Sequence, residues 1–140
     1  MSEEKGPTFR SSPETLRLRV ITASLTVNDL DASLYFYRDV VGFTVHELWE
    51  HEGTVMGADL IAGNAHLLIG QDDWAKGRDR EKGIGFRLYF TTKQAVDDVA
   101  KAIKERGGDL ASEPADMPWG GRAFSMVDPD GFNVTIASDG

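Results

Sequence analysis

Hydrophobic and polar residues alternate along the chain in two successive blocks of the same order. In the first block, residues 16–27 alternate with period two, which predicts a β-strand. The apolar face of this strand is predicted to hold Ile21, Ala23, Leu25 and Val27, and the polar face Thr22, Ser24 and Thr26. A helix is predicted to follow, because Asn28 or Asp29 can cap its start and Gly42 can end it.

Three more strands complete the first block. Residues 43–49 and 54–62 are predicted strands around a polar turn at 50–53. Gly63 and Asn64 then turn the chain into a fourth strand over residues 65–71. Residues 72–83 are charged and aperiodic apart from Trp74, which indicates a connector or a lid.

The second block repeats this order from residue 84. Its first predicted strand places one alternating set toward the helix, namely Ile84, Phe86, Leu88 and Phe90, and leaves Gly85, Arg87 and Tyr89 on the other face. Apolar residues spaced i, i+3, i+4 and i+7 predict a helix, and they are Val96, Val99, Ala100 and Ile103. A short strand near residues 109–111 and a Pro-containing loop precede the last two strands.

The last two strands are joined by the turn Asp128-Pro129-Asp130-Gly131. Asp128 can hydrogen-bond to nearby backbone, proline presets φ, and Gly131 accepts a left-handed conformation, so a β-hairpin is predicted. After the turn, Phe132, Val134 and Ile136 form an apolar set that alternates with Asn133, Thr135 and Ala137.

The doubled order predicts an α+β fold of two βαβββ modules that form an open, eight-stranded, barrel-like cleft. Thr22 and Gly85 hold equivalent places 63 residues apart. We expect a flexible polar tail at residues 1–15 and one domain over 16–140. Module one spans about 16–71 and module two about 84–138, joined by the connector.

Composition narrows the classes of partner. The chain has 140 residues, no cysteine, a net charge of −8 and no apolar run long enough to cross a bilayer. These features exclude disulfides and thiolate chemistry and argue against nucleic acid or an anionic membrane as partners. A soluble, cytoplasmic protein is expected.

Several segments resemble the vicinal oxygen chelate superfamily, which includes glyoxalase I, fosfomycin-resistance enzymes, extradiol dioxygenases, methylmalonyl-CoA epimerase and bleomycin-resistance proteins. The matching segments are residues 25–33 (LTVNDLDAS), 36–43 (FYRDVVGF), 118–120 (PWG) and 128–132 (DPDGF). The resemblance covers about residues 16–138 and implies the paired-module fold.

Enzymes of this superfamily hold a divalent metal with His, Glu or Gln on the first and last strand of each module. The resemblance carries these positions over to Thr22, Leu68, Gly85 and Thr135. None of the four is an effective metal ligand, so neither a metal nor another cofactor is expected.

The remaining chemistry of the predicted cleft is polar and aromatic. The cleft-lining candidates are Thr22, Ser24, His66, Arg87, Tyr89, Trp119 and Thr135. His66 is interpreted as a hydrogen-bonded or partly solvated residue rather than a ligand. Arg87 is either the anchor for an anionic ligand group or one half of a structural salt bridge. Trp119, Trp74 and Trp49 can supply aromatic walls with Tyr89, although Trp119 can equally pack beneath the hairpin.

The resemblance favours the metal-independent bleomycin-resistance branch, whose members sequester a drug without chemistry. Two alternatives stay open: an enzyme of the superfamily (a lyase, epimerase or dioxygenase) with a displaced metal site or none, and a structural or regulatory module without catalysis. The resemblance also implies a homodimer, in which each cleft is often built from both chains.

Overall fold

The computed structural model describes residues 16–139, so the predicted tail at 1–15 lies outside the described residues. Each half of the chain forms a βαβββ module, as predicted. Module one consists of β1 Ala23–Val27, α1 Leu30–Leu34, the π-helical segment η1 Tyr35–Val41, β2 Thr44–His51, β3 Thr54–Ala62 and β4 Ala65–Gln71. Module two consists of β5 Arg87–Thr92, α2 Val96–Glu105, β6 Ser112–Asp116, β7 Arg122–Val127 and β8 Asn133–Ser138.

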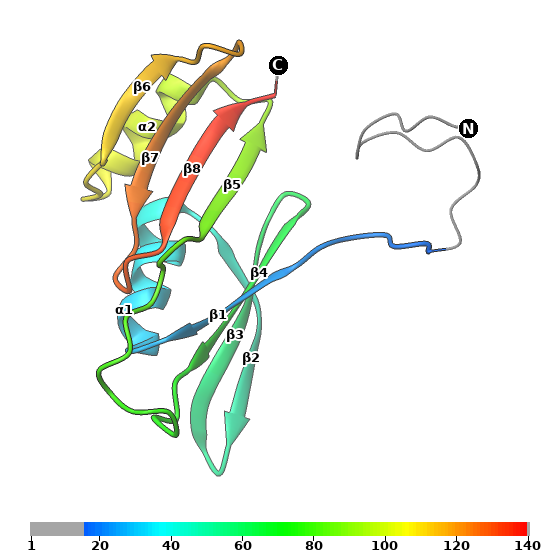
Figure 1. Ribbon diagram of the computed structural model, residues 1–140, viewed down its shortest axis with the longest axis vertical. Helices are drawn as coiled ribbons and strands as arrows, with labels where there is room; N and C mark the ends of the chain where they lie inside the picture. Colours follow the sequence, from blue (N-terminus) through cyan, green and yellow to red (C-terminus); the bar gives the residue numbers. More distant parts are fainter. Residues whose placement is uncertain (1–15, 140) are drawn as a thin grey trace, which may run out of the picture.

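The two modules form two four-stranded mixed sheets with equivalent topology (Figure 1). The strand orders are β1-β4-β3-β2 and β5-β8-β7-β6. In each sheet the first and last strands of the module run parallel and the other pairs are antiparallel. The sheets are not closed into a barrel. Within residues 16–139 no helix is long and apolar enough to cross a membrane.

The first helix begins and ends at the predicted residues, but its second half is a π-helix. Asp29 caps its start by accepting a hydrogen bond from the Ala32 amide, and Gly42 ends it with φ of 115°. The wider π turn changes which side chains face the core, so Val40 is buried while Val41 is only half-buried.

Three strand boundaries also differ from prediction. β1 begins at Ala23 rather than at residue 16, so Ile21 lies outside the sheet and is 93% exposed instead of packing on the apolar face. β5 begins at Arg87, because Gly83 and Gly85 adopt φ of 80° and 71° in a turn before it. Ile84 and Phe86 are consequently exposed rather than packed toward α2. β6 lies at Ser112–Asp116 instead of residues 109–111 and contains Pro114, which the edge of a sheet tolerates.

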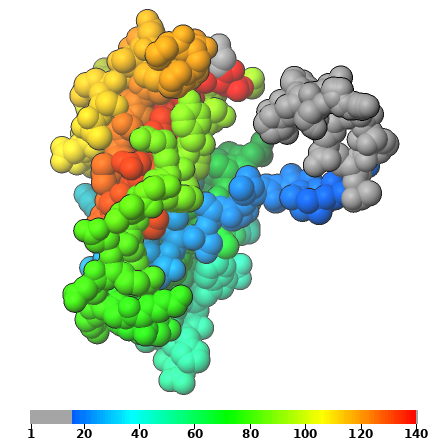
Figure 2. Space-filling model, in the orientation of Figure 1, coloured from blue at the N-terminus to red at the C-terminus, as the bar shows by residue number. Residues whose placement is uncertain are grey.

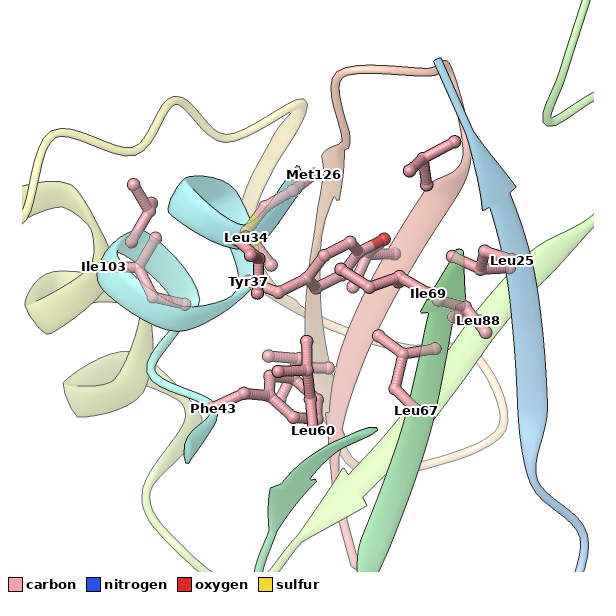
Figure 3. Close-up of a cluster of buried hydrophobic side chains, with 14 of the residues drawn as sticks. Leu25, Leu34, Tyr37, Phe43, Leu60, Leu67, Ile69, Leu88, Ile103 and Met126 are labelled. Atoms are coloured by element: carbon pink, nitrogen blue, oxygen red, sulfur yellow. The ribbon is translucent and has the colours of Figure 1, made fainter. Parts of the chain in front are cut away.

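One hydrophobic core joins the two modules (Figure 3). Leu60, Leu67 and Ile69 from the first sheet and Met126 from the second belong to the same buried cluster. Tyr37, fully buried, lies among them and stacks edge-on against Phe43 with ring centroids 6.0 Å apart. Since residues from both modules share this core, the modules are expected to unfold together.

A polar contact between the modules lies beside this core. Asp128 accepts hydrogen bonds from the amides of Asp130 and Phe132, as the turn prediction requires, and also from the Tyr37 hydroxyl at 2.6 Å. Asp130 accepts from the Asn28 amide at 2.9 Å. Burial raises the pKa of Asp128, and burial together with the nearby Asp128 carboxyl raises the pKa of Tyr37. The hairpin turn is therefore docked onto the start of the first helix.

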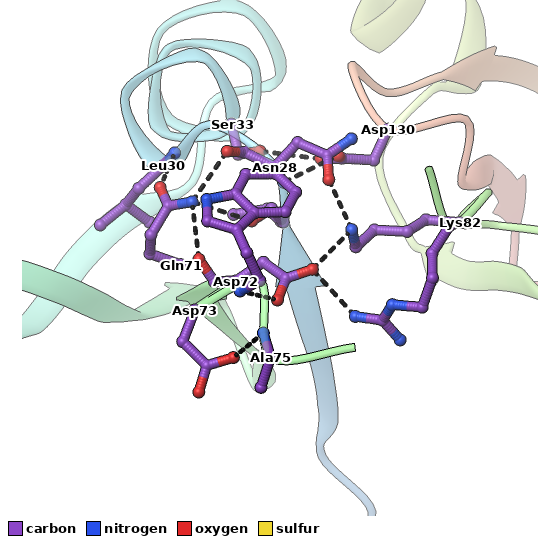
Figure 4. Close-up of polar contacts among 12 residues, drawn as sticks. Asn28, Leu30, Ser33, Gln71, Asp72, Asp73, Ala75, Lys82 and Asp130 are labelled. Carbon is purple, nitrogen blue, oxygen red and sulfur yellow. Dashed lines mark hydrogen bonds and ion pairs between the residues drawn. The ribbon is translucent and has the colours of Figure 1, made fainter. Parts of the chain in front are cut away.

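The connector is held in place by Asp72 (Figure 4). Its carboxylate accepts hydrogen bonds from the Trp74 amide, Arg80 and Lys82 at 2.9, 2.8 and 2.9 Å. These donors, led by Lys82, lower the pKa of Asp72. Because Lys82 also donates to Asn28 at the end of β1, the connector is tied to module one at both of its ends.

Candidate functional site

The sheet of module two has a polar face opposite the core, which we call the Arg87 face. A row of aligned residues crosses its four strands: Tyr89, Thr135, Ser125 and Ser112. The hydroxyls of Ser112 and Ser125 are hydrogen-bonded at 2.7 Å. The alternation that directs Leu88 into the core forces Arg87 and Tyr89 onto this opposite face.

Arg87 lies next to the centre of the row and is exposed. Its Nη1 donates to the Thr135 hydroxyl at 2.5 Å. Within residues 16–139 it forms no ion pair, so the part of the chain that is described contains no carboxylate partner for a structural salt bridge. A guanidinium has five N–H donors, and one hydrogen bond to a hydroxyl leaves the others available to a ligand oxygen.

Tyr89 and Trp119 lie at the edge of a cavity of about 280 Å³, which we call the hairpin pocket. Its other lining residues come from the β6–β7 hairpin and β8 and include Met117, Gly121, Arg122 and Ser138. Gly121 has φ of 81°, and a Cβ added there would lie 2.7 Å from the Ser138 hydroxyl oxygen. A glycine is therefore required where the loop closes over β8.

The sheet of module one has its own polar face, which we call the His66 face. An aligned row again crosses four strands: Ser24, Leu68, Asp59 and Glu47. His66 lies on the same face and forms a 3.1 Å contact between Nδ1 and Asp59 Oδ1. A bulge in β2 between Val45 and Glu47 allows His46 to reach this face, where its ring lies edge-on to His66 at 6.2 Å.

The structure brings some of the predicted site residues together. Arg87, Tyr89 and Thr135 share the Arg87 face, and Trp119 meets Tyr89 in the hairpin pocket. Ser24 and His66 lie on the His66 face, and Thr22 lies just before β1.

The predicted aromatic walls are not brought together. Trp74 lies in the connector under Arg78, 4.6 Å from the guanidinium carbon to the ring centroid. Trp49 covers Gly57, where an added Cβ would lie 2.7 Å from the indole. Neither lines the hairpin pocket with Tyr89 and Trp119.

The residues at the superfamily's metal positions do not fit a metal. Leu68 has no donor atom, Thr135 is hydrogen-bonded to Arg87, and Gly85 lies in the turn before β5 rather than in the strand where it was predicted. Within residues 16–139 no three His, Asp or Glu side chains converge in a geometry that could hold an ion. The side chains at these positions are therefore not suited to metal-assisted chemistry.

One residue of this site was not identified from the sequence. Asp59 lies between Ala58 and Leu60, which are both fully buried, so its side chain must point to the opposite face. The same period-two argument that placed His66 could have found it.

The fold defines a class of protein, the paired βαβββ proteins, in which each module contributes one four-stranded mixed sheet. The model for the Glyoxalase/Bleomycin resistance protein/Dioxygenase superfamily matches residues 19–136, and the chain belongs to this superfamily.

Several curated relatives carry the name of one activity. A probable lactoylglutathione lyase of Vibrio cholerae is 29% identical, covering 84% of this chain and 88% of its own length. A probable lactoylglutathione lyase of Synechocystis is 27% identical over an alignment that covers 80% of this chain and 88% of the relative. A putative lactoylglutathione lyase of Brassica oleracea is 23% identical, and this chain spans only 47% of its length.

Solved structures agree in fold. A superfamily member from Sphaerobacter thermophilus has a TM-score of 0.68 at 25% identity, covering 88% of this chain and 98% of its own. TioX from Micromonospora has a TM-score of 0.69 at 20% identity, and the superposition covers 84% of this chain and 96% of TioX. At such identity the likeness to TioX concerns the fold alone.

Proposed function

We propose that this protein binds a small organic molecule on the Arg87 face, with Arg87 as the polar anchor. The observation that carries the proposal is an exposed guanidinium that has no ion pair within residues 16–139 and lies two residues from Tyr89 along β5. In a chain of net charge −8, such a group favours a ligand with a carboxylate, phenolate or carbonyl oxygen.

The surroundings of Arg87 support a flat or partly apolar ligand. Tyr89 and Trp119 border the hairpin pocket, and both are well exposed, at 51% and 71%. Amphipathic aromatic side chains of this kind stack on planar ligands and exclude water from a neighbouring charged hydrogen bond.

Arg87→Met tests the proposal. Ligands are first found by thermal shift with polycyclic and peptide antibiotics and with S-lactoylglutathione, because a ligand that binds only the folded state raises the Tm. For a ligand found in this way, Arg87→Met is expected to weaken binding by about 1–3 kcal/mol, or roughly 5- to 150-fold in Kd, with an unchanged Tm of the free protein.

The matched control is Arg38→Met. Arg38 is an exposed arginine on η1 that pairs with its neighbour Asp39 at 3.0 Å, so its loss is expected to change neither affinity nor Tm appreciably. An unchanged affinity of Arg87→Met together with a lowered Tm would reject the anchor role and assign Arg87 to the fold.

A second candidate function is that of a superfamily enzyme of the lyase type. Two features support it: the names of the relatives from Vibrio cholerae and Synechocystis, and the Asp59–His66 pair on the His66 face. Since the metal positions carry no effective ligands, such an enzyme would depend on the protein's own acid and base groups.

A further inference from the structure

A second cavity, of about 560 Å³, lies between the start of α2 and the β6–β7 hairpin, and we call it the α2 groove. Its walls come from four segments: residues 94–97, residues 116–117, residues 120–122 and Ser138. Unlike the hairpin pocket, the α2 groove has a helical wall and is not lined by Tyr89 or Trp119. Its volume is within the usual range for sites that hold a small organic molecule.

Arg122 holds the two walls of the α2 groove together. Its Nε and Nη2 donate to the Asp97 carboxylate on α2 at 3.2 and 3.1 Å, and its Nη1 donates to Asp116 Oδ1 on β6 at 3.0 Å. Nη2 also donates to the Pro114 carbonyl oxygen at 3.1 Å. Since all three guanidinium nitrogens are engaged, Arg122 fixes the positions of both carboxylates at the groove.

One carboxylate oxygen at the groove has no donor. Within residues 16–139, Asp116 accepts hydrogen bonds through Oδ1 alone, so Oδ2 is available to a donor from outside the chain. The Asp116 side chain is 84% exposed, which leaves this oxygen accessible. The strongest hydrogen bonds to an ionised carboxylate come from charged donors.

The net charge around the groove favours a cation over an anion. Asp97 and Asp116 contribute two negative charges and Arg122 one positive charge, so one negative charge is uncompensated. Asp98, in the first turn of α2, adds another. The start of α2 opposes them with only about half a positive charge from the helix dipole. An anionic ligand would therefore meet net repulsion, and a cationic ligand net attraction.

The groove also offers apolar surface beside this charge. Val96 is buried and Met117 is half-buried, and both line the groove. At Gly120, with φ of 103°, an added Cβ would meet no atom within 4 Å, so the space over this residue is open. A ligand can therefore place an apolar group against Val96 and Met117 while its charged end reaches Asp116.

We propose that the α2 groove binds a small organic amine. The ammonium group of this ligand donates to Asp116 Oδ2, and its apolar body packs against Val96 and Met117. The site goes beyond the proposed function, because the guanidinium on the Arg87 face favours a ligand of the opposite charge. Residues 120–122 border the groove as well as the hairpin pocket, so the two cavities lie on either side of the same hairpin.

Phenethylamine is the probe, with 2-phenylethanol as its neutral analogue and 3-phenylpropionate as its anionic one. ¹⁵N-HSQC titrations of the full chain at low salt should show saturable shifts for phenethylamine at the amides of Ala95, Gly120 and Gly121. We expect it to bind about 3- to 10-fold more tightly than the alcohol, as a charged hydrogen bond at a partly exposed site allows. The propionate should bind more weakly than the alcohol. Equal affinities for amine and alcohol, or shifts confined to Tyr89 and Thr135 on the Arg87 face, would overturn the proposal.

Asp116→Asn tests the role of the carboxylate. It removes the charge and keeps the shape of the side chain, so phenethylamine binding should weaken by about 3- to 10-fold and lose its advantage over the alcohol. The matched control is Asp98→Asn, because Asp98 is an exposed carboxylate in the first turn of α2 that does not line the groove. Its affinity for phenethylamine should stay close to that of the wild type. An equal loss in both variants would indicate attraction to a diffuse acidic surface and would reject the site at Asp116.

Ala95→Phe tests the groove without changing its charges. Ala95 is exposed and lines the groove, so a phenyl group there should occupy the cavity while the core and the Tm stay unchanged. Binding of phenethylamine and of 2-phenylethanol should both weaken. Ala95→Ser, which keeps the side chain small, should bind both as the wild type does. Undiminished binding by Ala95→Phe would place the amine elsewhere and reject the proposal.

Discussion

Tyr37 is the residue that connects the hydrophobic core with the polar contact between the modules. Its ring is fully buried beside Phe36 and Phe43, while its hydroxyl donates to Asp128. Asp128 is itself buried, so its oxygens cannot replace a lost donor with bulk water.

Tyr37→Phe is therefore expected to lower the free energy of unfolding by about 1–3 kcal/mol, because the carboxyl of Asp128 loses a partner while the ring keeps its volume. Urea denaturation followed by tryptophan fluorescence measures the change. Tyr35→Phe, at a site that is 56% exposed, is the control and should stay within about 0.5 kcal/mol of wild type. Equal stabilities of the two variants would contradict a role for the Tyr37–Asp128 contact.

At the scale of elements, the connector between β4 and β5 behaves as a fixed part of the structure rather than a lid. Asp72 is 5% exposed and holds the start of the connector to its end through Lys82. Gly83 then lies so close to the turn between β7 and β8 that an added Cβ would clash with the Gly131 carbonyl oxygen. The charged composition predicted its position at the surface but not its anchoring.

Asp72 should make part of the stability depend on acid pH. Its folded-state pKa is lowered, mainly by Lys82. The contribution of Asp72 to the free energy of unfolding is therefore complete above the unfolded pKa of about 3.9 and is lost as pH falls through that value toward the folded pKa. The raised pKa of Asp128 has the opposite effect. Its contribution to the free energy of unfolding is present at low pH and is lost as pH rises through the folded-state pKa.

Asp72→Asn is accordingly expected to be less stable than wild type at pH 7 and to approach it as pH falls from 5 to 3. Urea midpoints at pH 7, 5, 4 and 3 measure the difference. Asp73→Asn changes an exposed carboxylate that, within residues 16–139, accepts a hydrogen bond from the Ala75 amide alone, and it should differ little from wild type at pH 7. A wild-type advantage over Asp72→Asn that is the same at every pH would contradict the proposed linkage.

At the scale of the whole molecule, several large apolar side chains are exposed within residues 16–139. The segment before β1 extends away from the body of the protein (Figure 2), and Leu18, Val20 and Ile21 on it are 78%, 72% and 93% exposed. Ile84, before β5, is 73% exposed. Clustered apolar exposure of this kind is typical of surfaces that a partner covers.

We therefore expect a homodimer that covers these side chains with a second copy of the chain. Sedimentation equilibrium at micromolar concentration should give twice the chain mass of 15.4 kDa. Val20→Lys with Ile21→Lys should shift the equilibrium toward monomer, and Leu16→Lys with Leu18→Lys provides a second pair on the same segment. A wild-type protein that sediments only as monomer would count against this expectation.

The sequence by itself determined the order of the elements and the face on which most side chains lie. Period-two alternation placed Val134 in the core and Arg87 on the opposite face, and the turn residues around Gly63 and Gly131 set the hairpins where the structure has them. These features depend on local geometry, which each residue and its neighbours specify. The family resemblance, now confirmed over residues 19–136, agrees with that order.

Only the tertiary structure decided which distant groups meet. Three contacts could not be read from the sequence pattern: Asp128 with Tyr37, Lys82 with Asp72, and Asp59 with His66. Each depends on strand register or on packing between modules, which arise when the whole core forms and are not encoded in any single stretch.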